Sequence, residues 1–217
     1  MPNKDYPYYP PKLIKKISKI LKSGRVNYWT GNEGALFEKE FSKYVGNKYS
    51  IAVSNGSVAL ELVLKAFNFK KEDQIIVTPR SFIISASCVI NSGLTPVFAD
   101  VDLNGNLSLD GIKKSYTKKV KAIILVHLNG LPCDLDPIIN FAKKRKIKII
   151  EDCSQAHGAL YKNKPVGSFG DASTWSFCQD KIISTGGEGG MISTNNKKIW
   201  ESCWSYKDHG KNYFSVF

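Results

Sequence analysis

Residues 147–158 of this 217-residue chain are Ile147-Lys148-Ile149-Ile150-Glu151-Asp152-Cys153-Ser154-Gln155-Ala156-His157-Gly158. The apolar run Ile147–Ile150 predicts a short buried strand, and two carboxylates follow it directly. In open α/β sheets, ligands bind beyond the carboxyl ends of the strands. We therefore expect Asp152 either to contact a ligand or to contact a neighbouring helix.

The chain around this stretch alternates between strand-like and helix-like patterns from about residue 49 onward. Strands are predicted over residues 49–53, 74–78, 95–99, 120–126, 147–150, 173–177 and 191–194. Helices are predicted over residues 58–66, 81–90, 108–116 and 135–146, after two amphipathic helices within residues 10–45. This alternation favours an α/β fold, with a mostly parallel sheet flanked by helices on both faces.

The length of the chain suits one sizeable core, or one domain and part of a second. We expect residues 1–48 to form an N-terminal helical segment and residues 49–217 to form the main domain, packed together as one structural unit. Internal repeats and low-complexity linkers are absent from the sequence.

The net charge of +12 raises the alternative of a nucleic-acid-binding protein. Only three of the 31 basic residues are arginine, and the lysines scatter over predicted helix faces with short clusters at 118–119 and 143–146. No basic helix or aromatic-basic repeat of a nucleic-acid module is present, so we expect no nucleic-acid partner. A diffuse positive field would still attract phosphorylated or nucleotide-linked substrates.

Five cysteines at irregular spacings, without a CxxC pair or a Cys/His cluster, indicate reduced thiols and no metal site.

The first 16 residues are polar and rich in lysine and proline, unlike a signal peptide. No apolar run approaches the roughly 20 residues that span a bilayer. We expect a cytoplasmic protein with no membrane partner.

A lysine after the sixth predicted strand is the second key feature. Lys181 ends the run Ser176-Phe177-Cys178-Gln179-Asp180-Lys181, and the glycine-rich segment 186–190 follows. Lysine is by default a surface residue, and a glycine run alone is a weak signal. Together with an acid at a strand end, however, this lysine matches pyridoxal phosphate (PLP) chemistry. The amine condenses with the cofactor aldehyde, and the carboxylate keeps the pyridine nitrogen protonated.

Other polar and aromatic residues follow predicted strands. Gly56 and Ser57 lie at a strand-to-helix junction, where free N–H groups bind anions, although Ser57 could instead be an ordinary N-cap. Phe82 could stack on a planar cofactor or belong to the core. Ser176 is either a phosphate ligand or a buried strand serine, and Gln155 could bind a ligand or cap a turn. Because all of these positions follow strands of one sheet, a single crevice can collect them.

The ordered set of motifs resembles the DegT/DnrJ/EryC1/StrS family. The resemblance covers residues 10–217 and rests on these segments: Gly56-Ser57-Val58-Ala59-Leu60, residues 151–158, Ser176-Phe177 with Lys181, Gly187-Glu188-Gly189-Gly190, and Asp208-His209-Gly210. Thr30-Gly31 and Phe37-Glu38 are similar to the family's early pattern. The resemblance implies the fold type I (aspartate aminotransferase-like) architecture and a PLP-dependent sugar aminotransferase.

The resemblance also implies roles for single residues. Lys181 would bond to the cofactor and shuttle a proton, and Asp152 would pair with the pyridine nitrogen. Gln155 would bond the ring hydroxyl, and Phe82 would stack on the ring. The phosphate would be held by Gly56, Ser57 and Ser176. Relatives with histidine in place of this lysine are dehydratases, so the lysine favours amino transfer, typically from glutamate, to a nucleotide-diphosphate-linked keto sugar in polysaccharide or glycoconjugate synthesis.

Relatives continue past Asp208-His209-Gly210 into a smaller C-terminal domain, and their sites are completed across a dimer interface. This sequence ends at Phe217, so we expect the cofactor-holding large domain without that small domain. We expect a homodimer or a complementing chain. The alternative is a truncated, non-catalytic remnant that binds PLP or a full-length partner.

Overall fold

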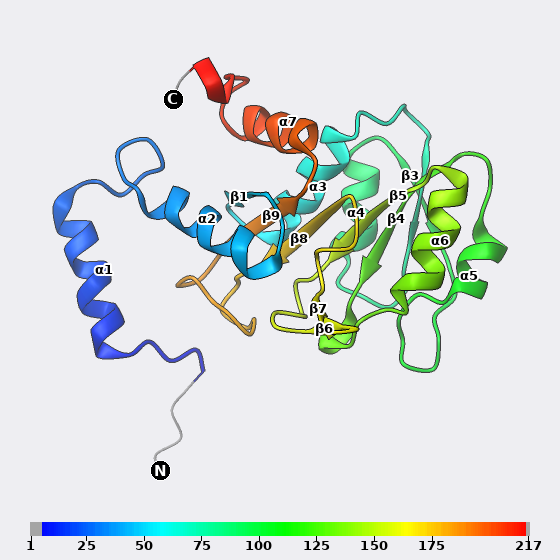
Figure 1. Cartoon of the computed structure of the whole chain (residues 1–217), viewed down its shortest axis with the longest axis horizontal. Coiled ribbons are helices and arrows are strands. Elements are labelled where there is room, and N and C mark those ends of the chain that lie inside the picture. Colours follow the sequence, from blue (N-terminus) through cyan, green and yellow to red (C-terminus); the bar gives the residue numbers. More distant parts are fainter. Residues whose placement is uncertain (1–5, 216–217) are drawn as a thin grey trace, which may run out of the picture.

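The computed structural model describes residues 6–215. Residues 1–5 of the expected segment 1–48 and residues 216–217 of the expected segment 49–217 lie outside the described residues. Seven strands form one sheet in the order β1-β9-β8-β5-β4-β2-β3 (Figure 1). The strands are β1 (Tyr49–Val53), β2 (Gln74–Val77), β3 (Thr95–Phe98), β4 (Val120–Val126), β5 (Lys148–Asp152), β8 (Ala172–Ser176) and β9 (Gly190–Thr194). Two further short strands, β6 (Leu160–Tyr161) and β7 (Lys164–Pro165), form a separate hairpin.

The sheet is mostly parallel, as the alternating pattern predicts. Parallel pairing joins five strands in the order β8, β5, β4, β2 and β3. β9 lies between β8 and β1 and runs antiparallel to both. β1 and β8 therefore point the same way as the other parallel strands. All carboxyl ends of these six strands meet at one edge of the sheet, which is where a ligand site is expected.

Helices cover both faces of the sheet (Figure 1). One face packs against α3 (Gly56–Ala66), α4 (Ile84–Asn91) and α7 (Lys197–Lys207). The other packs against α2 (Glu33–Val45), α5 (Leu109–Ser115) and α6 (Leu135–Arg145). The remaining helical elements are α1 (Pro11–Ser23), η1 (Leu128–Gly130) and η2 (Tyr213–Ser215). α1 has no buried residue and extends away from the sheet.

The central strands are apolar on both faces, which explains why they read as continuous hydrophobic runs. In β2, Ile75 and Val77 pack toward α3, while Ile76 packs toward the α6 side. β4 shows the same division, with Ile124 on one side and Ile123 on the other. Successive side chains of a strand point to opposite faces, so only a sheet covered on both sides buries such a run.

Most predicted boundaries agree with the structure to within one or two residues, and the differences at residues 150 and 81 have clear physical reasons. The strand expected to end at Ile150 continues through Glu151 to Asp152, because Asp152 still pairs with Val126 of β4. The helix expected from Ser81 starts at Ile84, since the residues before it form tighter turns, with the Ser85 N–H bonded to the Phe82 carbonyl. Helix α7 and the β6–β7 hairpin are elements that the sequence analysis did not predict.

Within the described residues, no helix has the length and apolar character needed to cross a bilayer.

Candidate active site

One cavity of about 820 Å³ lies at the carboxyl edge of the sheet. All seven residues proposed from the sequence line it: Gly56, Ser57, Phe82, Asp152, Gln155, Ser176 and Lys181. They come from four separate strand-to-loop connections, between β1 and α3, β2 and α4, β5 and β6, and β8 and β9. The topology therefore brings together residues that lie up to 125 positions apart, from Gly56 to Lys181.

The acid and the lysine differ in their surroundings. Asp152 is the last residue of β5, is 5% exposed, and its Oδ1 accepts the Ser154 N–H at 3.1 Å. Burial raises the pKa of this carboxyl group, since an unpaired buried charge is unfavourable. The Lys181 Nζ lies 3.0 Å from the exposed Asp180 carboxylate, and its hydrogen bond lowers the pKa of Asp180. Asp152 thus forms no ion pair among residues 6–215, while the lysine amine is held at the cavity wall by Asp180.

The start of α3 forms a cradle for an anion. Asn55 is the N-cap, with its Oδ1 accepting the Val58 N–H at 2.9 Å, so Ser57 is not the cap. The N–H groups of Gly56 and Ser57 belong to the first helical turn, where no preceding carbonyl of the helix bonds them. A Cβ on Gly56 would lie 3.0 Å from the Cβ of Ser176. This close approach places the helix start beside the Ser176 hydroxyl.

The glycine run after Lys181 has a local structural role. A Cβ on Gly190 would collide with the backbone of Asn55, so glycine lets the start of β9 pass close to the α3 cap. Gly187 has φ of +143°, a conformation that side chains rarely adopt. Its carbonyl accepts the Gln179 N–H at 3.0 Å. These glycines shape the loop that carries Lys181.

Gln155 is oriented by the backbone of a neighbouring turn. Its Oε1 accepts the Asn129 N–H at 2.8 Å. Asn129 has φ of +53°, which turns this N–H toward the loop after β5. Because the carbonyl oxygen is engaged, the amide NH₂ of Gln155 remains available to donate a hydrogen bond into the cavity.

Phe82 lies at the mouth of the cavity and is 68% exposed. The alternative of a core phenylalanine is therefore excluded. Ile83 beside it is 71% exposed. An apolar ring held at the cavity mouth is suited to covering a planar ligand.

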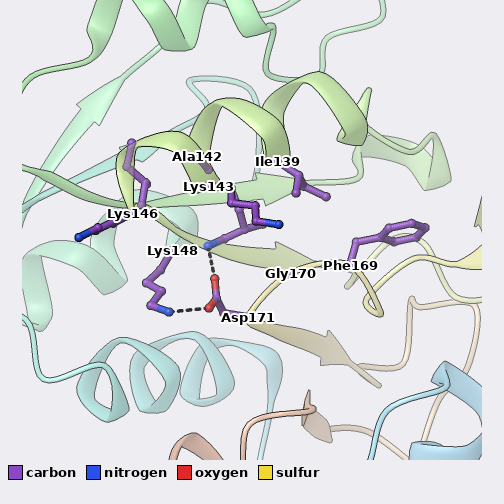
Figure 2. A pocket seen from close by; sticks show the side chains of 10 residues that line it. Ile139, Ala142, Lys143, Lys146, Lys148, Phe169, Gly170 and Asp171 are labelled. Carbon is purple, nitrogen blue, oxygen red and sulfur yellow. Dashed lines mark hydrogen bonds and ion pairs between the residues drawn. The ribbon is translucent and has the colours of Figure 1, made fainter.

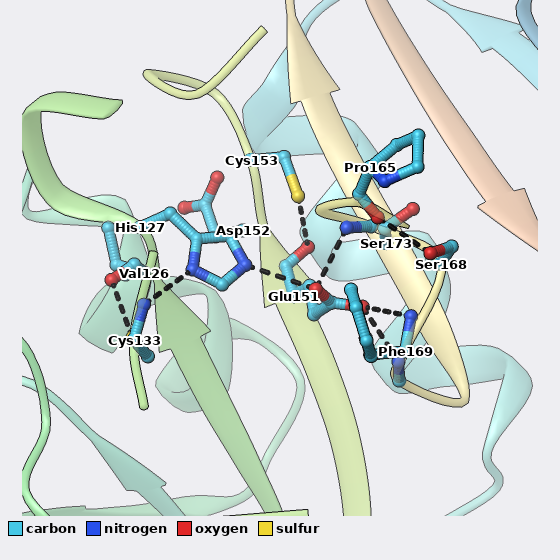
Figure 3. Close-up of polar contacts among 12 residues, drawn as sticks. Val126, His127, Cys133, Glu151, Asp152, Cys153, Pro165, Ser168, Phe169 and Ser173 are labelled. Carbon is cyan, nitrogen blue, oxygen red and sulfur yellow. Dashed lines mark hydrogen bonds and ion pairs between the residues drawn. The ribbon is translucent and has the colours of Figure 1, made fainter. Parts of the chain in front are cut away.

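Glu151 and Asp152 are neighbours in sequence but make different contacts (Figure 3). Glu151 is fully buried, and its carboxylate accepts the N–H groups of Gly167, Phe169 and Gly170 at 2.7–2.8 Å. His127 donates to it from Nε2 at 3.1 Å. The Cys133 N–H donates to Nδ1 of the same ring, which fixes the proton on Nε2. This network holds the strand end beneath the cavity.

The same network explains the one cluster of potential metal ligands found among residues 6–215. His127, Glu151 and Cys153 place their donor atoms within 4.8 Å of one another. Both ring nitrogens and both carboxylate oxygens are already used in the hydrogen bonds above. The cluster is therefore a hydrogen-bonded support of the fold.

The remaining histidines and cysteines occupy the positions expected of structural residues. His157 is buried against the rings of Trp175 and Phe177, and burial lowers its pKa to about 4. His209 is exposed. All five cysteines are free thiols, and Cys178 lines the cavity.

Several lining residues were not singled out from the sequence. These are Ser154, Cys178, Gln179, Asp180 and Glu188, together with Asn55 as the helix cap. The Asn-Gly pair before a helical pattern was the available signal for Asn55. The others carry no sequence signal of their own. Cys178, Gln179, Asp180 and Glu188 line the cavity through the path of the lysine loop, and Ser154 lines it through the turn after β5.

The family model described as the DegT/DnrJ/EryC1/StrS aminotransferase family matches residues 9–215. The chain belongs to this family. It is 39% identical over 208 residues to GDP-perosamine synthase of Escherichia coli O157:H7, covering 94% of this chain and 57% of that protein. The family resemblance inferred from the motifs is thus confirmed.

Solved structures of family members support the same fold. An aminotransferase from Psychrobacter cryohalolentis matches with a TM-score of 0.97 and 49% identity, covering all of this chain and 55% of the other. A GDP-4-keto-6-deoxymannose-3-dehydratase that carries PLP trapped with glutamate matches with a TM-score of 0.86 and 30% identity, over 95% of this chain and 55% of the other. The fold type I prediction is confirmed, and PLP is the cofactor of the family. The chain spans a little over half the length of these relatives.

Proposed function

We propose that this chain forms the cofactor-holding part of a PLP-dependent aminotransferase. The enzyme would transfer an amino group from glutamate to a nucleotide-diphosphate-linked keto sugar. The observation that carries the proposal is the convergence of a lysine, a buried carboxylate and a helix-start anion cradle in one cavity.

The residues present fit PLP. The buried Asp152, whose pKa is raised by burial and which forms no ion pair among the described residues, is suited to receive the protonated pyridine nitrogen. The NH₂ of Gln155 would donate a hydrogen bond to the ring hydroxyl, and Phe82 would stack on the ring. The phosphate would be held by the N–H groups of Gly56 and Ser57 with the hydroxyl of Ser176.

Bound PLP supplies an electron sink that stabilises negative charge on the reacting carbon. Lys181 would supply the amine that holds the cofactor, and its Nζ would be the group placed to hold or move a proton at the reacting carbon. The Asp180 carboxylate holds this amine at the cavity wall until it reacts. Asp152 would keep the ring nitrogen protonated, because its carboxylate is buried and an opposite charge beside it is therefore strongly favoured.

The substrate class rests on the relatives. A synthase of GDP-perosamine and a dehydratase of GDP-4-keto-6-deoxymannose are both similar to this chain, and the second carries glutamate with PLP. Phe82 at the cavity and its neighbour Ile83 are both exposed, which leaves apolar surface that a second subunit would cover. We therefore propose that the site works within a homodimer, or together with a complementing chain.

The test is an absorbance titration of the purified chain with PLP. Wild type is compared with Lys181→Ala and with Lys198→Ala, a matched exposed lysine outside the cavity. We expect a new absorption band in the wild type and in Lys198→Ala that is absent in Lys181→Ala. If the band persists in Lys181→Ala, another lysine reacts and the assigned site is wrong.

A folded wild-type chain that shows no band would favour the non-catalytic remnant. A positive band leads to the second step, in which glutamate and GDP-linked 4-keto sugars are added with and without a full-length relative. Conversion of the band by glutamate supports the proposed amino donor. No change with any amino donor would overturn the aminotransferase assignment.

A further inference from the structure

The edge of the sheet opposite the cavity is strongly basic. The amino ends of β2, β4 and β5, which are adjacent strands, are preceded by loops rich in lysine. We name as the basic edge the residues 70–73, 118–121, 143–148 and Asp171, which contain ten basic and three acidic side chains. Hydrogen bonds from Gln74 N to Lys119 O and from Thr117 Oγ1 to Gln74 Oε1 tie the β2 and β4 loops together.

A hollow of about 450 Å³ lies within this edge, between the end of α6 and the start of β5 (Figure 2). Lys143, Lys146 and Lys148 line it, together with the apolar side chains of Ile139 and Phe169. Figure 2 shows Lys143 and Lys146 pointing in opposite directions from the end of α6. The lysines are thus spread along the surface and do not converge on one small anion.

The positive charge is largely unneutralised. Lys148 pairs with Asp171 at 2.7 Å, and this carboxylate also accepts the Ile149 N–H. The other lysines of the basic edge form no ion pair among the described residues. Arg145 is engaged differently, with its guanidinium 3.9 Å from the centre of the Phe141 ring.

Local helix electrostatics explain only part of this arrangement. Basic residues in the last turn of α6 interact favourably with the negative end of the helix dipole. Lys70, Lys71, Lys118 and Lys119 lie outside the helices, so the dipole of α6 does not account for them. Like charges side by side destabilise a fold by repulsion, and a partner of opposite charge relieves that repulsion.

We propose that the basic edge binds the surface of a membrane rich in anionic phospholipids. Clustered lysines attract such surfaces at about 1 kcal/mol each, about fivefold in partitioning, without a shaped pocket. Nucleic acid fits less well. Its recognition favours several arginines and exposed aromatic rings for stacking, and the basic edge contains a single arginine, whose guanidinium stacks on the Phe141 ring.

The topology gives this contact a defined orientation. The basic edge lies at the amino ends of the parallel strands and the cavity lies at their carboxyl ends, so a membrane-bound chain presents its cavity to the solution. The expectation of no membrane partner came from the lack of a spanning segment. The proposed contact is peripheral and arises only when three separate loops meet in the fold.

The experiment measures co-sedimentation of the protein with vesicles. One set contains phosphatidylglycerol and phosphatidylcholine in equal amounts, and the other contains phosphatidylcholine alone. The edge variant combines Lys118→Gln, Lys119→Gln, Lys143→Gln and Lys146→Gln. The matched control combines Lys39→Gln, Lys43→Gln, Lys164→Gln and Lys211→Gln, which remove the same charge from other exposed positions. Circular dichroism checks that each variant is folded.

We expect wild type and control to bind the anionic vesicles and the edge variant to lose at least about tenfold in partitioning. Added salt should release the wild type, and none of the proteins should bind phosphatidylcholine alone. Equal losses in the edge and control variants would show a nonspecific effect of net charge and overturn the proposal. So would release by low concentrations of inorganic pyrophosphate, or a preference for a single-stranded RNA competitor over the vesicles.

Discussion

The two edges of one sheet carry polar residues in opposite arrangements. At the carboxyl edge, a lysine, a buried carboxylate, an amide and a helix start differ in chemistry and converge on one cavity. At the amino edge, side chains of the same charge spread outward without a common target. Convergence of unlike groups gives a specific small-molecule site, whereas repetition of like groups gives a surface that recognises charge alone. Substitutions at the two edges should therefore differ in kind as well as in size.

The largest effect is expected at the cavity from Lys181→Ala. The variant should lose the PLP-dependent absorption band completely while its melting temperature stays close to that of the wild type, since the one ion pair that it removes is with the exposed Asp180. Absorbance and thermal unfolding measure the two properties on one sample. A folded variant with an undiminished band would show that Lys181 is not the amine that reacts with PLP.

Removing the support beneath the cavity should mainly affect stability. Glu151→Ala leaves three backbone N–H groups, one of them buried, and the buried His127 ring without an acceptor. Breaking such a buried charged network costs about 4 kcal/mol of unfolding free energy. Denaturant titration of wild type, Glu151→Ala and Glu151→Gln tests this, with the Gln variant expected to lose less because it retains one acceptor oxygen. An unchanged unfolding midpoint in Glu151→Ala would contradict the assigned role.

Acid should weaken the fold through His157. Its pKa is lowered to about 4 in the folded protein by burial, from 6.5 in a free chain. Between these values the unfolded chain binds the proton more tightly, so stability falls as the pH drops from about 6.5 to 4, by up to about 3 kcal/mol. Unfolding free energies across this range should fall less in His157→Phe, which keeps a ring against Trp175 and Phe177. Parallel pH curves for the two proteins would remove His157 as the cause.

Asp152→Asn should lower the affinity for PLP but raise the stability of the cofactor-free protein. The amide keeps the shape of the carboxyl group but not the charge that pairs with the ring nitrogen, so PLP affinity should fall on the order of a hundredfold. The cofactor-free variant should be more stable than wild type at neutral pH, because burial disfavours the charged Asp152. Titration with PLP and thermal unfolding without PLP test both parts. Unchanged affinity would show that the carboxylate does not reach the cofactor.

The smallest effect on stability is expected at the basic edge. Lys118→Gln with Lys119→Gln should change the unfolding free energy by less than about 0.5 kcal/mol, as is usual for exposed side chains. The PLP-dependent band should also remain, since these residues lie at the opposite edge from the cavity. A loss of the band in this variant would show that the basic edge affects PLP binding at the opposite edge, contrary to this expectation.

The sequence by itself determined the fold class, because apolar runs that alternate with helical patterns leave few arrangements other than a covered, mostly parallel sheet. It also indicated the cavity residues, since each follows a strand and strand ends of one direction meet at one edge. Boundaries such as the start of α4 depended on turn hydrogen bonds that have no strong sequence pattern.

The sequence analysis singled out Asp152 as the carboxylate at the cavity, and the tertiary structure supplies the physical reason why Glu151 beside it does not share that role. Successive residues of a strand point to opposite faces, so Glu151 supports the loop at 167–170 and Asp152 lines the site. The cap at Asn55, the orientation of Gln155 by the Asn129 backbone and the meeting of three lysine loops depend on contacts between distant segments. Such contacts are set by the packing of the whole chain, and a local pattern does not record them.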